Sequence, residues 1–464
     1  MELARIAETL SPSQIVGETK VEIEDLAYDT RAVRAGALFF CVPGERFDGH
    51  DLAKRALEAG AAALVVERPV ASRVPQLVVA DSRRAMATAA AEFFGHPTHE
   101  LQVAGVTGTN GKTTTAYLLH SILAAAGRKP GLLGTIESRI GGERHAAIRT
   151  TPEAIDLQRT FRAMLDAGDL SCAMEATSHG SQLRRLDGVR FASLVFTNLT
   201  QDHLDLHGTM DAYFEAKRRL FVEGDRPPAA INVGDEWGRR LAADRPDALT
   251  YGFAEDAALR PDALEGIELK LRGRFNVENA LAAMAGARLL GVDDDAVARG
   301  IEAVGGVPGR FESVDEGQPF TVIVDYAHTP DSLENVLATA RELSSGRVIC
   351  VFGCGGDRDR EKRPVMGRIA GELADLPIVT SDNPRSEDPR AIIDEIAAGA
   401  EGELEVVPDR RQAIARAIES AEPGDVVVIA GKGHEQGQQF RDRTVPFDDR
   451  EVAREALRKA GATA

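Results

Sequence analysis

The residues best suited to phosphate chemistry lie in residues 105–115. The centre of this stretch, residues 108–114, reads Gly-Thr-Asn-Gly-Lys-Thr-Thr. An apolar run at 101–106 precedes it, and an apolar pattern at helical spacing, residues 116–123, follows it and stops at Gly127. A strand, a glycine-rich loop, Lys-Thr and a helix form the setting in which backbone N–H groups and a helix N-terminus converge on phosphate oxygens. The pattern predicts a phosphate-binding loop.

Two side chains in this loop have distinct predicted roles. Lys112 would reach the terminal phosphates of a nucleotide, and Thr113 would place its hydroxyl on Mg²⁺. Val106 stands where the common loop pattern has its first glycine. The alternative is a glycine-rich strand-to-helix turn that carries a lysine by chance. The intact order of strand, loop and helix favours phosphate binding.

Polar residues at the ends of two further strands could hold the metal. Glu175 ends the apolar run 171–175, and a carboxylate there could bind a phosphate-bound Mg²⁺. The segment 197–208 follows another apolar run and contains His203. His203 is a candidate second ligand, although Mg²⁺ prefers oxygen. The alternatives are a solvated acid at a strand end and an ordinary loop histidine.

Two predicted helices contain polar residues whose role spacing alone does not fix. Lys217 lies in residues 213–221, where the periodicity indicates an exposed basic helix face. Asn276 and Asn279 could cap a helix or contact a nucleotide base. For the two asparagines, the residue pattern leaves both roles open.

The last third of the chain places polar loops after its predicted strands. The strands read 321–324, 347–352, 377–380 and 425–430. The loop 381–385 offers a carboxylate, an amide and a guanidinium, a set that can bind the amino and carboxylate groups of an amino acid. Its alternative is an Asx-type turn with an exposed arginine. Four polar loops at strand ends of one domain favour a binding cleft, because ligands bind outside the carboxyl ends of open α/β sheets.

Strands alternate with helical patterns along most of the chain, which indicates an α/β fold with mostly parallel sheets. Glycine- and proline-containing breakers at 95–97 and 305–309 suggest three domains. These domains are a smaller N-terminal α/β domain at 1–97, a central P-loop ATPase-type domain at 98–308, and a C-terminal Rossmann-like domain at 309–464. The length of 464 residues agrees with about three domains.

The composition is that of a globular protein, with 43% hydrophobic and 28% charged residues. The net charge of −18 argues against nucleic-acid binding as the main task. The first ten residues show no secretory signal, and no apolar run reaches the ~20 residues that span a bilayer. The four cysteines show no zinc spacing, and Cys350 and Cys354 are expected to pack. We therefore expect a cytoplasmic, reduced protein.

Several segments, in their order along the chain, resemble the Mur ligases, ATP-dependent enzymes that build the peptide of bacterial cell-wall precursors. They are residues 108–114, Thr-Asn-Leu-Thr-Gln-Asp-His-Leu-Asp at 197–205, Asp-Tyr-Ala-His-Thr-Pro at 325–330, and Gly-Lys-Gly-His-Glu at 431–435. Asp-Asn-Pro-Arg at 382–385 resembles the motif of the branch that adds meso-diaminopimelate to UDP-N-acetylmuramoyl-L-alanyl-D-glutamate. The resemblance covers nearly the whole chain.

The resemblance implies a role for each matching position. The residues implied to bind ATP are Gly108, Thr109, Asn110, Gly111, Lys112, Thr113, Thr114, Asn279, Arg310 and Asp325. Those implied for Mg²⁺ are Thr113, Glu175, His203 and Lys217, the last matching a lysine that the family carbamylates. Lys112, Lys217 and His203 would serve catalysis.

Two substrate-binding sets follow from the same resemblance. The UDP-sugar dipeptide would contact Tyr28, Thr30, Glu45, Arg46, Phe47, Thr150, Thr151, Ser178 and Arg185. Diaminopimelate would contact Arg358, Asp382, Asn383, Pro384, Arg385, Gly431 and Glu435. Two positions differ from the usual family pattern: Arg149 replaces an asparagine, and Thr30 replaces a serine.

The resemblance implies an acyl-phosphate ligase that works as a monomer, without nucleic acid or membrane insertion. A carboxylate would attack the γ-phosphate of ATP, and an amine would then displace phosphate. The C-terminal domain must bring its amino acid to the acyl phosphate, so we expect a hinge near 305–310. The alternatives are a sister ligase for another amino acid such as lysine, a folylpolyglutamate-type synthetase, and a nucleotide-dependent binding protein without catalysis.

Overall fold

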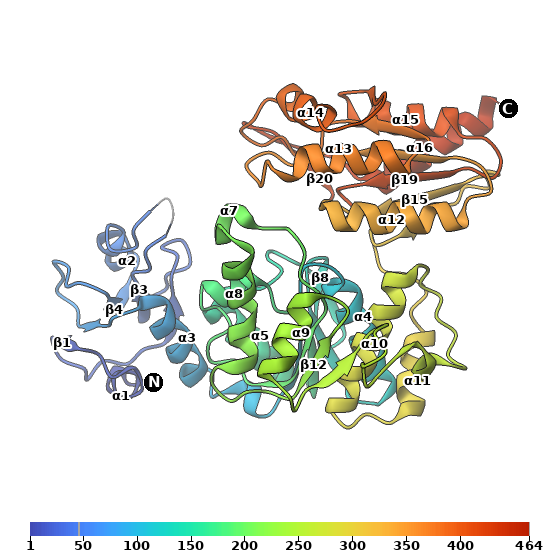
Figure 1. Cartoon of the computed structure of the whole chain (residues 1–464). Coiled ribbons are helices and arrows are strands. Elements are labelled where there is room, and N and C mark those ends of the chain that lie inside the picture. The colour runs from blue at the N-terminus through green and yellow to red at the C-terminus, as the bar shows by residue number, and fades with distance from the viewer. Residues whose placement is uncertain (45–46, 464) are drawn as a thin grey trace.

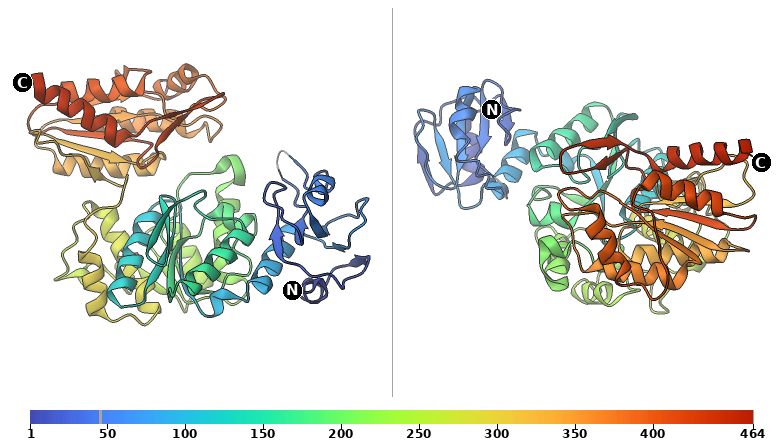
Figure 2. Two further views of the ribbon diagram at one scale, coloured as in Figure 1. Left: turned by 180° about the vertical axis from the view of Figure 1, so that it is seen from behind. Right: turned by 90° about the horizontal axis from the view of Figure 1, so that it is seen from above.

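The computed structural model describes residues 1–44 and 47–463, which form three lobes along the chain. The N-terminal lobe packs beside the central lobe, and the C-terminal lobe lies over the central lobe (Figure 1). The views from behind and from above show the same arrangement (Figure 2). The predicted α/β fold with mostly parallel sheets and three domains is confirmed. The limits 97/98 and 308/309 stay predictions.

The N-terminal lobe has one sheet in the order β1-β5-β4-β3-β2, parallel except for β1. Its strands are β1 (Gln14–Val16), β2 (Asp25–Ala27), β3 (Ala37–Phe40), β4 (Ala61–Val66) and β5 (Gln76–Val78). Its helices are α1 (Leu3–Leu10), α2 (Ala53–Glu58) and α3 (Ser82–Phe93), followed by the 3-10 turn η1 (Pro97–His99).

The central sheet runs β13-β12-β11-β6-β10-β7-β8-β9, and within the described residues only the pairs β7–β8 and β8–β9 at one edge are antiparallel. Its strands are β6 (Gln102–Thr107), β7 (Pro130–Leu133), β8 (Glu137–Ile140), β9 (Glu143–Ala146), β10 (Ser171–Glu175), β11 (Phe191–Phe196), β12 (Ala229–Asn232) and β13 (Leu249–Tyr251). Its helices are α4 (Lys112–Ala125), α5 (Ala154–Asp166), α6 (Ser178–Gln182), α7 (Leu204–His207), α8 (Met210–Val222), α9 (Glu236–Asp244), η2 (Pro261–Leu264), α10 (Arg274–Leu289) and α11 (Asp294–Glu302).

Helices cover both faces of the central sheet, as the alternating pattern predicts. Along β6, Ala104 and Val106 pack against α4, α10 and α11. Val103 faces the opposite layer, which contains α5 and α8. The period-two alternation of the strand therefore divides the core into two layers.

The C-terminal sheet runs β14-β15-β19-β16-β17-β18, antiparallel only at β14 within the described residues. Its strands are β14 (Glu312–Ser313), β15 (Thr321–Asp325), β16 (Val348–Phe352), β17 (Leu376–Val379), β18 (Glu405–Val406) and β19 (Val426–Ala430), with a separate hairpin β20 (Gly437–Gln439) and β21 (Thr444–Pro446). Its helices are α12 (Pro330–Leu343), α13 (Lys362–Leu373), α14 (Pro389–Ala397), α15 (Arg410–Ser420) and α16 (Asp449–Thr463).

The N-terminal lobe is joined to the central lobe through α5. Ala154 and Ile155 belong to the apolar core of the N-terminal lobe. The Tyr28 hydroxyl donates to Asp156 at 2.6 Å, and Arg159 donates to Asp25 at 2.8 Å. Apolar packing and these two polar contacts together join the two lobes.

Three expectations about individual residues have clear outcomes. The four cysteines are free and buried, and Cys350 and Cys354 pack as expected. The helix-capping alternative for Asn276 and Asn279 is wrong, because Gly273 precedes the first residue of α10 and both asparagines lie inside the helix. No helix of the described residues is long and apolar enough to cross a membrane.

Candidate active site

The phosphate loop joins β6 to α4, as its sequence predicts. Two of its glycines are required by close contacts. A Cβ at Gly108 would lie 1.9 Å from Thr197 Oγ1, and a Cβ at Gly111 would lie 2.3 Å from Asn279 Oδ1. Both glycines also have positive φ, +149° and +85°. The loop can take this tight path only because side chains are missing there.

The segment after β11 fixes the loop from its other side. Asn198 Oδ1 accepts from the backbone N–H of Asn110 at 2.9 Å, and Thr197 Oγ1 donates to the Asn110 carbonyl at 2.6 Å. The Thr109 hydroxyl donates to the Thr200 carbonyl at 3.2 Å. The parallel register pairs Phe196 with Thr107, so the two strand ends meet at one edge of the sheet.

Lys112 folds back onto its own loop. Its Nζ donates to the carbonyls of Gly108 at 3.1 Å and Thr109 at 2.8 Å. Burial lowers the pKa of Lys112, and Glu175 and Asp202 partly oppose that shift. A phosphate oxygen entering the loop would give this ammonium a stronger, charged partner.

Glu175 and Thr113 meet where the sequence predicts a magnesium site. The Thr113 hydroxyl lies 3.0 Å from both carboxylate oxygens of Glu175. Thr135 adds a backbone N–H at 2.7 Å and a hydroxyl at 3.1 Å to the same carboxylate. Arg310, from the chain that leads into the C-terminal lobe, donates to the Thr113 hydroxyl at 3.0 Å.

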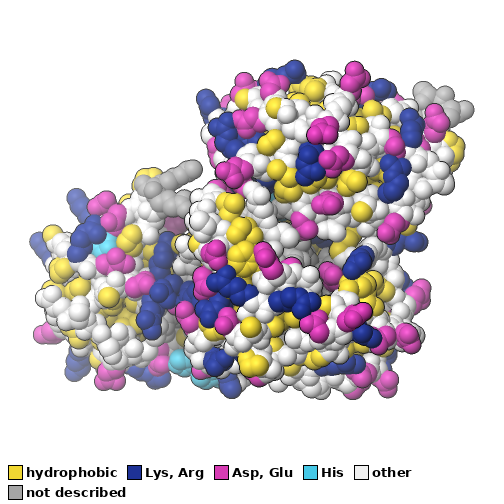
Figure 3. Space-filling view, in the orientation of Figure 1, with side chains coloured by type: hydrophobic (Ala, Val, Ile, Leu, Met, Phe, Trp, Pro, Cys, Tyr) yellow, Lys and Arg dark blue, Asp and Glu magenta, His cyan; other side chains and the backbone are white. Residues whose placement is uncertain are grey.

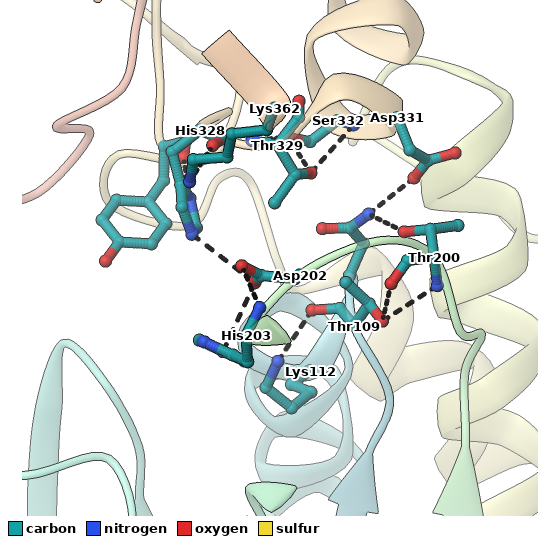
Figure 4. Close-up of polar contacts among 12 residues, drawn as sticks. Thr109, Lys112, Thr200, Asp202, His203, His328, Thr329, Asp331, Ser332 and Lys362 are labelled. Carbon is teal, nitrogen blue, oxygen red and sulfur yellow. Dashed lines mark hydrogen bonds and ion pairs between the residues drawn. The ribbon is translucent and has the colours of Figure 1, made fainter. Parts of the chain in front are cut away.

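Asp202, His203 and His328 meet where the central and C-terminal lobes face each other. In Figure 4, His328 and Asp202 point toward one another, and His203 lies beside Asp202. The nearest nitrogens lie 3.3 Å (His203) and 3.9 Å (His328) from Asp202 Oδ2. Burial alone would raise the pKa of Asp202, but the two histidines and Lys362 lower it. Burial lowers the pKa of His203 to about 3.

The expectation that Lys217 lies on an exposed helix face is wrong. Its side chain is 1% exposed, its Nζ donates to the Gly108 carbonyl at 2.8 Å, and it lies 4.6 Å from the Tyr213 ring centroid. Burial lowers the pKa of Lys217 well below its usual range, and Lys112 adds to that effect. Tyr213, Lys217 and Phe221 share one helical stripe at i, i+4 and i+8, which is the signal that could have predicted this burial.

A cavity of about 430 Å³ lies between the central and C-terminal lobes. The predicted site residues that line it are Thr109, Asn110, Gly111, Lys112, Thr113, Thr114, Thr150, Glu175, His203, Asn279, Arg310 and Asp325. Gly108 and Lys217 lie behind this lining and bond each other. The structure thus brings the predicted nucleotide and metal sets to one place.

Other lining residues were not predicted. Asn232 and Asp235 follow β12, so the strand-end rule could have identified them. Phe275 and Glu278 lie near the start of α10, and no strand end or motif in the sequence pointed to them. Asp331 comes from the first turn of α12 and accepts from Asn110 Nδ2 at 2.6 Å, which joins the C-terminal lobe directly to the phosphate loop.

Thr113 and Glu175 provide oxygen donors that suit Mg²⁺. The described residues contain no group of three His, Cys, Asp or Glu side chains placed to hold a metal ion. Magnesium is usually held by one or two carboxylates together with phosphate oxygens and water, so such a cage is not needed. The donor set fits a phosphate-bound Mg²⁺, with His203 in the same cavity wall.

Part of the predicted UDP-substrate set adjoins Glu175. Thr151 Oγ1 donates to the Glu175 carbonyl at 2.9 Å, and Arg185 donates to the Thr151 carbonyl at 3.1 Å. The Thr150 hydroxyl lies 3.0 Å from that of Thr135. Ser178 bonds His207 at 3.0 Å.

The rest of this set lies in the N-terminal lobe. Thr30 is buried, whereas Phe47 is 73% exposed. Glu45 and Arg46 lie outside the described residues. No described contact joins Thr30 or Phe47 to the group beside Glu175. Lys and Arg side chains gather along the boundary between the two lobes in the space-filling view (Figure 3).

Arg149, one of the two departures from the usual family pattern, belongs to an ion-pair cluster. Its Nη1 donates to Glu153 at 2.7 Å, and Arg185 approaches the same carboxylate at 2.9 Å. Arg83, from α3 of the N-terminal lobe, lies 3.8 Å from Glu153. Three guanidiniums around one buried carboxylate make this boundary locally cationic within an acidic protein.

The predicted amino-acid set forms a second cluster, at the carboxyl ends of β16, β17 and β19. Arg385 has a φ of +51°, and its Nη1 donates to the Gly356 carbonyl at 2.7 Å. Asn383 Nδ2 donates to Glu435 Oε2 at 2.8 Å. A Cβ at Gly431 would lie 2.5 Å from Asp382 Oδ2. Pro384 is buried within this turn.

This amino-acid cluster adjoins the nucleotide cavity but does not line it. Tyr326 separates the two, because it lines the cavity and its ring centroid lies 5.3 Å from that of His434. Arg358 is exposed, and its Nη1 donates to the Asp357 carbonyl at 3.0 Å. Burial and the nearby Arg358 lower the pKa of Arg385, which favours an anionic partner for this pair.

The chain matches three family models in the order of its lobes. Residues 22–94 match the Mur ligase family catalytic domain, 106–287 the Mur ligase middle domain, and 309–433 the Mur ligase glutamate ligase domain. A UDP-N-acetylmuramoyl-L-alanyl-D-glutamate–2,6-diaminopimelate ligase of Solibacter usitatus is 48% identical over 468 residues, which cover 95% of each chain.

Two solved structures resemble the whole chain. One is a UDP-N-acetylmuramoyl-L-alanyl-D-glutamate–2,6-diaminopimelate ligase, with 32% identity, a TM-score of 0.69 and 99% coverage of each chain. The other is a MurF ligase from Thermotoga maritima in complex with ADP, with 19% identity and a TM-score of 0.65, covering 95% of this chain and 99% of that one. The second likeness concerns the fold alone.

Proposed function

The chain belongs to the Mur ligase family, and we propose that it is the ATP-dependent ligase that adds meso-diaminopimelate to UDP-N-acetylmuramoyl-L-alanyl-D-glutamate. It would act in the cytoplasm, as a monomer, in the synthesis of peptidoglycan precursors. Relatives at 42–48% identity over nearly the whole chain carry the name of this ligase. The arrangement of the site supports the same reaction.

The phosphate loop would hold the ATP. Its backbone N–H groups and the N-terminus of α4 would face the β- and γ-phosphates, and Lys112 would exchange its carbonyl partners for phosphate oxygens. Asn279, Arg310 and Asp325, at the same cavity, would position the rest of the nucleotide. Arg310 reaches the cavity from the C-terminal side. It would therefore add positive charge beside the negative charge that develops on the oxygens of the transferring phosphoryl group.

Thr113, Glu175 and His203 would hold Mg²⁺, which supplies charge neutralisation at the phosphates when bound. The buried carboxylate of Glu175 is already oriented for this by two donors from Thr135. Because the protein groups are placed before substrate arrives, little reorganisation is needed during the reaction.

Lys217 would become a carbamate. Carbon dioxide adds to an unprotonated amine, and burial keeps this amine in the neutral form by lowering its pKa. The added carboxylate would stand beside the Gly108 carbonyl and Lys112, and would support a second Mg²⁺. Native mass spectrometry of the intact protein should show one added carbon dioxide, and Lys217→Ala should lack it.

The reaction proceeds in two steps on this assignment. The γ-carboxylate of D-glutamate attacks the γ-phosphorus of ATP, the bond to ADP breaks, and an acyl phosphate forms. The amine of diaminopimelate then attacks the acyl carbon, phosphate leaves, and the ammonium proton is lost. Thr150, Thr151 and Arg185 lie where they would hold the dipeptide beside Glu175.

The amino-acid cluster would select diaminopimelate. Arg385, with Arg358 near it, offers a guanidinium to the distal carboxylate that lysine lacks. Asp382 and Glu435 offer carboxylates to an ammonium group. A hinge near 305–310 would bring this cluster to the acyl phosphate.

The observation that carries this proposal is the contact of Thr113 with Glu175 in the cavity that the phosphate loop lines. The test incubates the protein with ATP, Mg²⁺, the UDP-dipeptide and mixed amino acids, and measures product mass. Oxygen-18 in the reacting carboxylate should pass into released phosphate. A product with lysine, activity on a folate, or slow hydrolysis that needs neither acceptor nor amino acid would favour the alternatives instead.

A further inference from the structure

Lys432 is a fully buried ammonium inside the amino-acid cluster. Its side chain is 0% exposed, and it is the second residue after β19. Nζ donates to Asn383 Oδ1 at 3.0 Å and to Glu435 Oε2 at 2.9 Å. Asn383 follows β17, so one cation joins the loops that follow two different strands. An unpaired buried ammonium is costly, which makes both contacts strongly favoured.

The contacts of Asn383 fix the direction of its amide. Oδ1 accepts from Lys432 Nζ and from the backbone N–H of Gln439 at 2.9 Å. Nδ2 donates to Glu435 Oε2 at 2.8 Å. An atom that receives two donors must be the carbonyl oxygen, so the amide cannot flip without losing three bonds.

The same network leaves specific atoms of Glu435 and Asn383 available to a ligand. Glu435 Oε2 accepts from both Lys432 and Asn383. Among the described residues, no hydrogen bond reaches Oε1, and the Glu435 side chain is 30% exposed. One N–H of the Asn383 amide is also left over. A free acceptor beside a free donor suits the ammonium and carboxylate groups of an amino acid.

We propose that Lys432 is a positioning residue that sets Asn383 and Glu435 for recognition of the amino-acid substrate. It does not touch the substrate itself, because its side chain is 0% exposed and two of its three N–H donors bond these two partners. The inference rests on the proposed function, in which both partners contact diaminopimelate. Without Lys432, the Asn383 amide loses one of the three hydrogen bonds that orient it, and Glu435 Oε2 loses one of its two donors.

The test compares steady-state kinetics of the full-length Lys432→Met variant with those of the parent. The KM for diaminopimelate should rise between about tenfold and a hundredfold, as expected for loss of hydrogen bonds from a charged donor. The KM values for ATP and the UDP-dipeptide should stay within about twofold, which a general folding defect would not produce. Lys432→Gln keeps one donor group and should give an intermediate KM.

Arg347→Met is the matched control. Arg347 pairs with Asp425 at 2.8 Å, and Asp425 immediately precedes β19, at the end of the strand opposite to Lys432. Arg347 has no described contact with a residue of the amino-acid cluster. Loss of the Arg347 side chain should leave the KM for diaminopimelate unchanged. An unchanged KM in Lys432→Met, or an equal rise for all three substrates, would overturn the proposal.

The positioning role and the proposed function can fail separately. If the parent protein makes no product from diaminopimelate, the proposed function fails. In that case, the crystal structure of Lys432→Met tests the positioning role. Separation of Asn383 Nδ2 from Glu435 Oε2, or an amide that has turned, would support it. The parent arrangement, kept without the ammonium, would refute it.

Discussion

The Thr113 hydroxyl lies 3.0 Å from both carboxylate oxygens of Glu175, although 62 positions separate the two residues in the chain. The parallel pairing of β6 with β10 creates this contact, because it sets Glu175 opposite Val106 at the same sheet edge. The glycine-rich loop then turns the chain back so that α4 begins beside the carboxylate. The register of the β6–β10 pair therefore places the Glu175 carboxylate beside the first turn of α4.

Glu175→Gln should lower kcat by at least about a hundredfold, the size of effect seen when one preorganised electrostatic group is removed. The amide keeps the size of the side chain but cannot offer two anionic oxygens to Mg²⁺. Coupled ADP release would measure the loss. Glu137→Gln, on β8, which is separated from β10 by β7, removes the charge of a carboxylate paired with Arg139 and should remain active. Parent-like turnover in Glu175→Gln would remove the metal role.

Much of this site could be predicted from local sequence. The loop at 108–114 and the strand ends at Glu175 and Asp325 follow apolar runs directly, and parallel sheets gather such ends at one edge. The hairpins β8–β9 and β20–β21 could not be predicted, because their residues are mostly polar and show no apolar alternation.

The burial of Lys217 was missed for a different reason. The run of basic residues at 217–219 suggests a solvated face, yet Arg218 and Arg219 alone remain partly exposed there. The loop carbonyl of Gly108, 109 positions away, gives the Lys217 ammonium a buried hydrogen-bond partner. The helical stripe of Tyr213, Lys217 and Phe221 could have predicted the burial but not the partner, because long-range contacts of this kind, like that between Asn110 and Asp331, leave no periodic signal in the chain.

Lys217→Ala should be nearly inactive and partly rescued by short carboxylic acids such as acetate. A small carboxylate can enter the space of the lost side chain and replace the carbamate. The measurement is initial rate against acetate concentration. Arg218→Ala, which removes the neighbouring residue bonded to Asp244, should keep its activity and show no response to acetate. Full activity of Lys217→Ala without acetate would contradict the assignment.

Arg385→Ala should lose diaminopimelate use while ATP affinity survives. Leaving a substrate carboxylate without its guanidinium should lower kcat/KM by about a hundredfold or more. Arg385→Lys should recover little, because a single ammonium cannot replace the two-pronged guanidinium. Isothermal titration with a non-hydrolysable ATP analogue provides the control. Equal kinetics for diaminopimelate in parent and variant would count against this role.

His120 on α4 should contribute to acid sensitivity. Burial lowers its pKa from 6.5 to about 4. Between these values the unfolded chain binds more protons than the folded one, so the free energy of unfolding falls as pH decreases. His120→Gln should lose less stability between pH 7 and pH 5 than the parent, measured by urea unfolding at both values. Identical pH dependence in the two proteins would refute this.

Asp331→Ala should loosen the C-terminal lobe from the phosphate loop. The Asp331 carboxylate accepts from Asn110 Nδ2 at 2.6 Å, and burial raises its pKa, which marks a contact enclosed between two lobes. Loss of this bond should shift the lobes toward an open arrangement and raise the KM for ATP several-fold, because Asn110 belongs to the loop that receives the phosphates. Small-angle scattering without nucleotide should report a larger radius of gyration.

Asp331→Asn, which retains an acceptor oxygen, should stay close to the parent. Superimposable scattering curves for Asp331→Ala and the parent would show that this bond does not hold the lobes together.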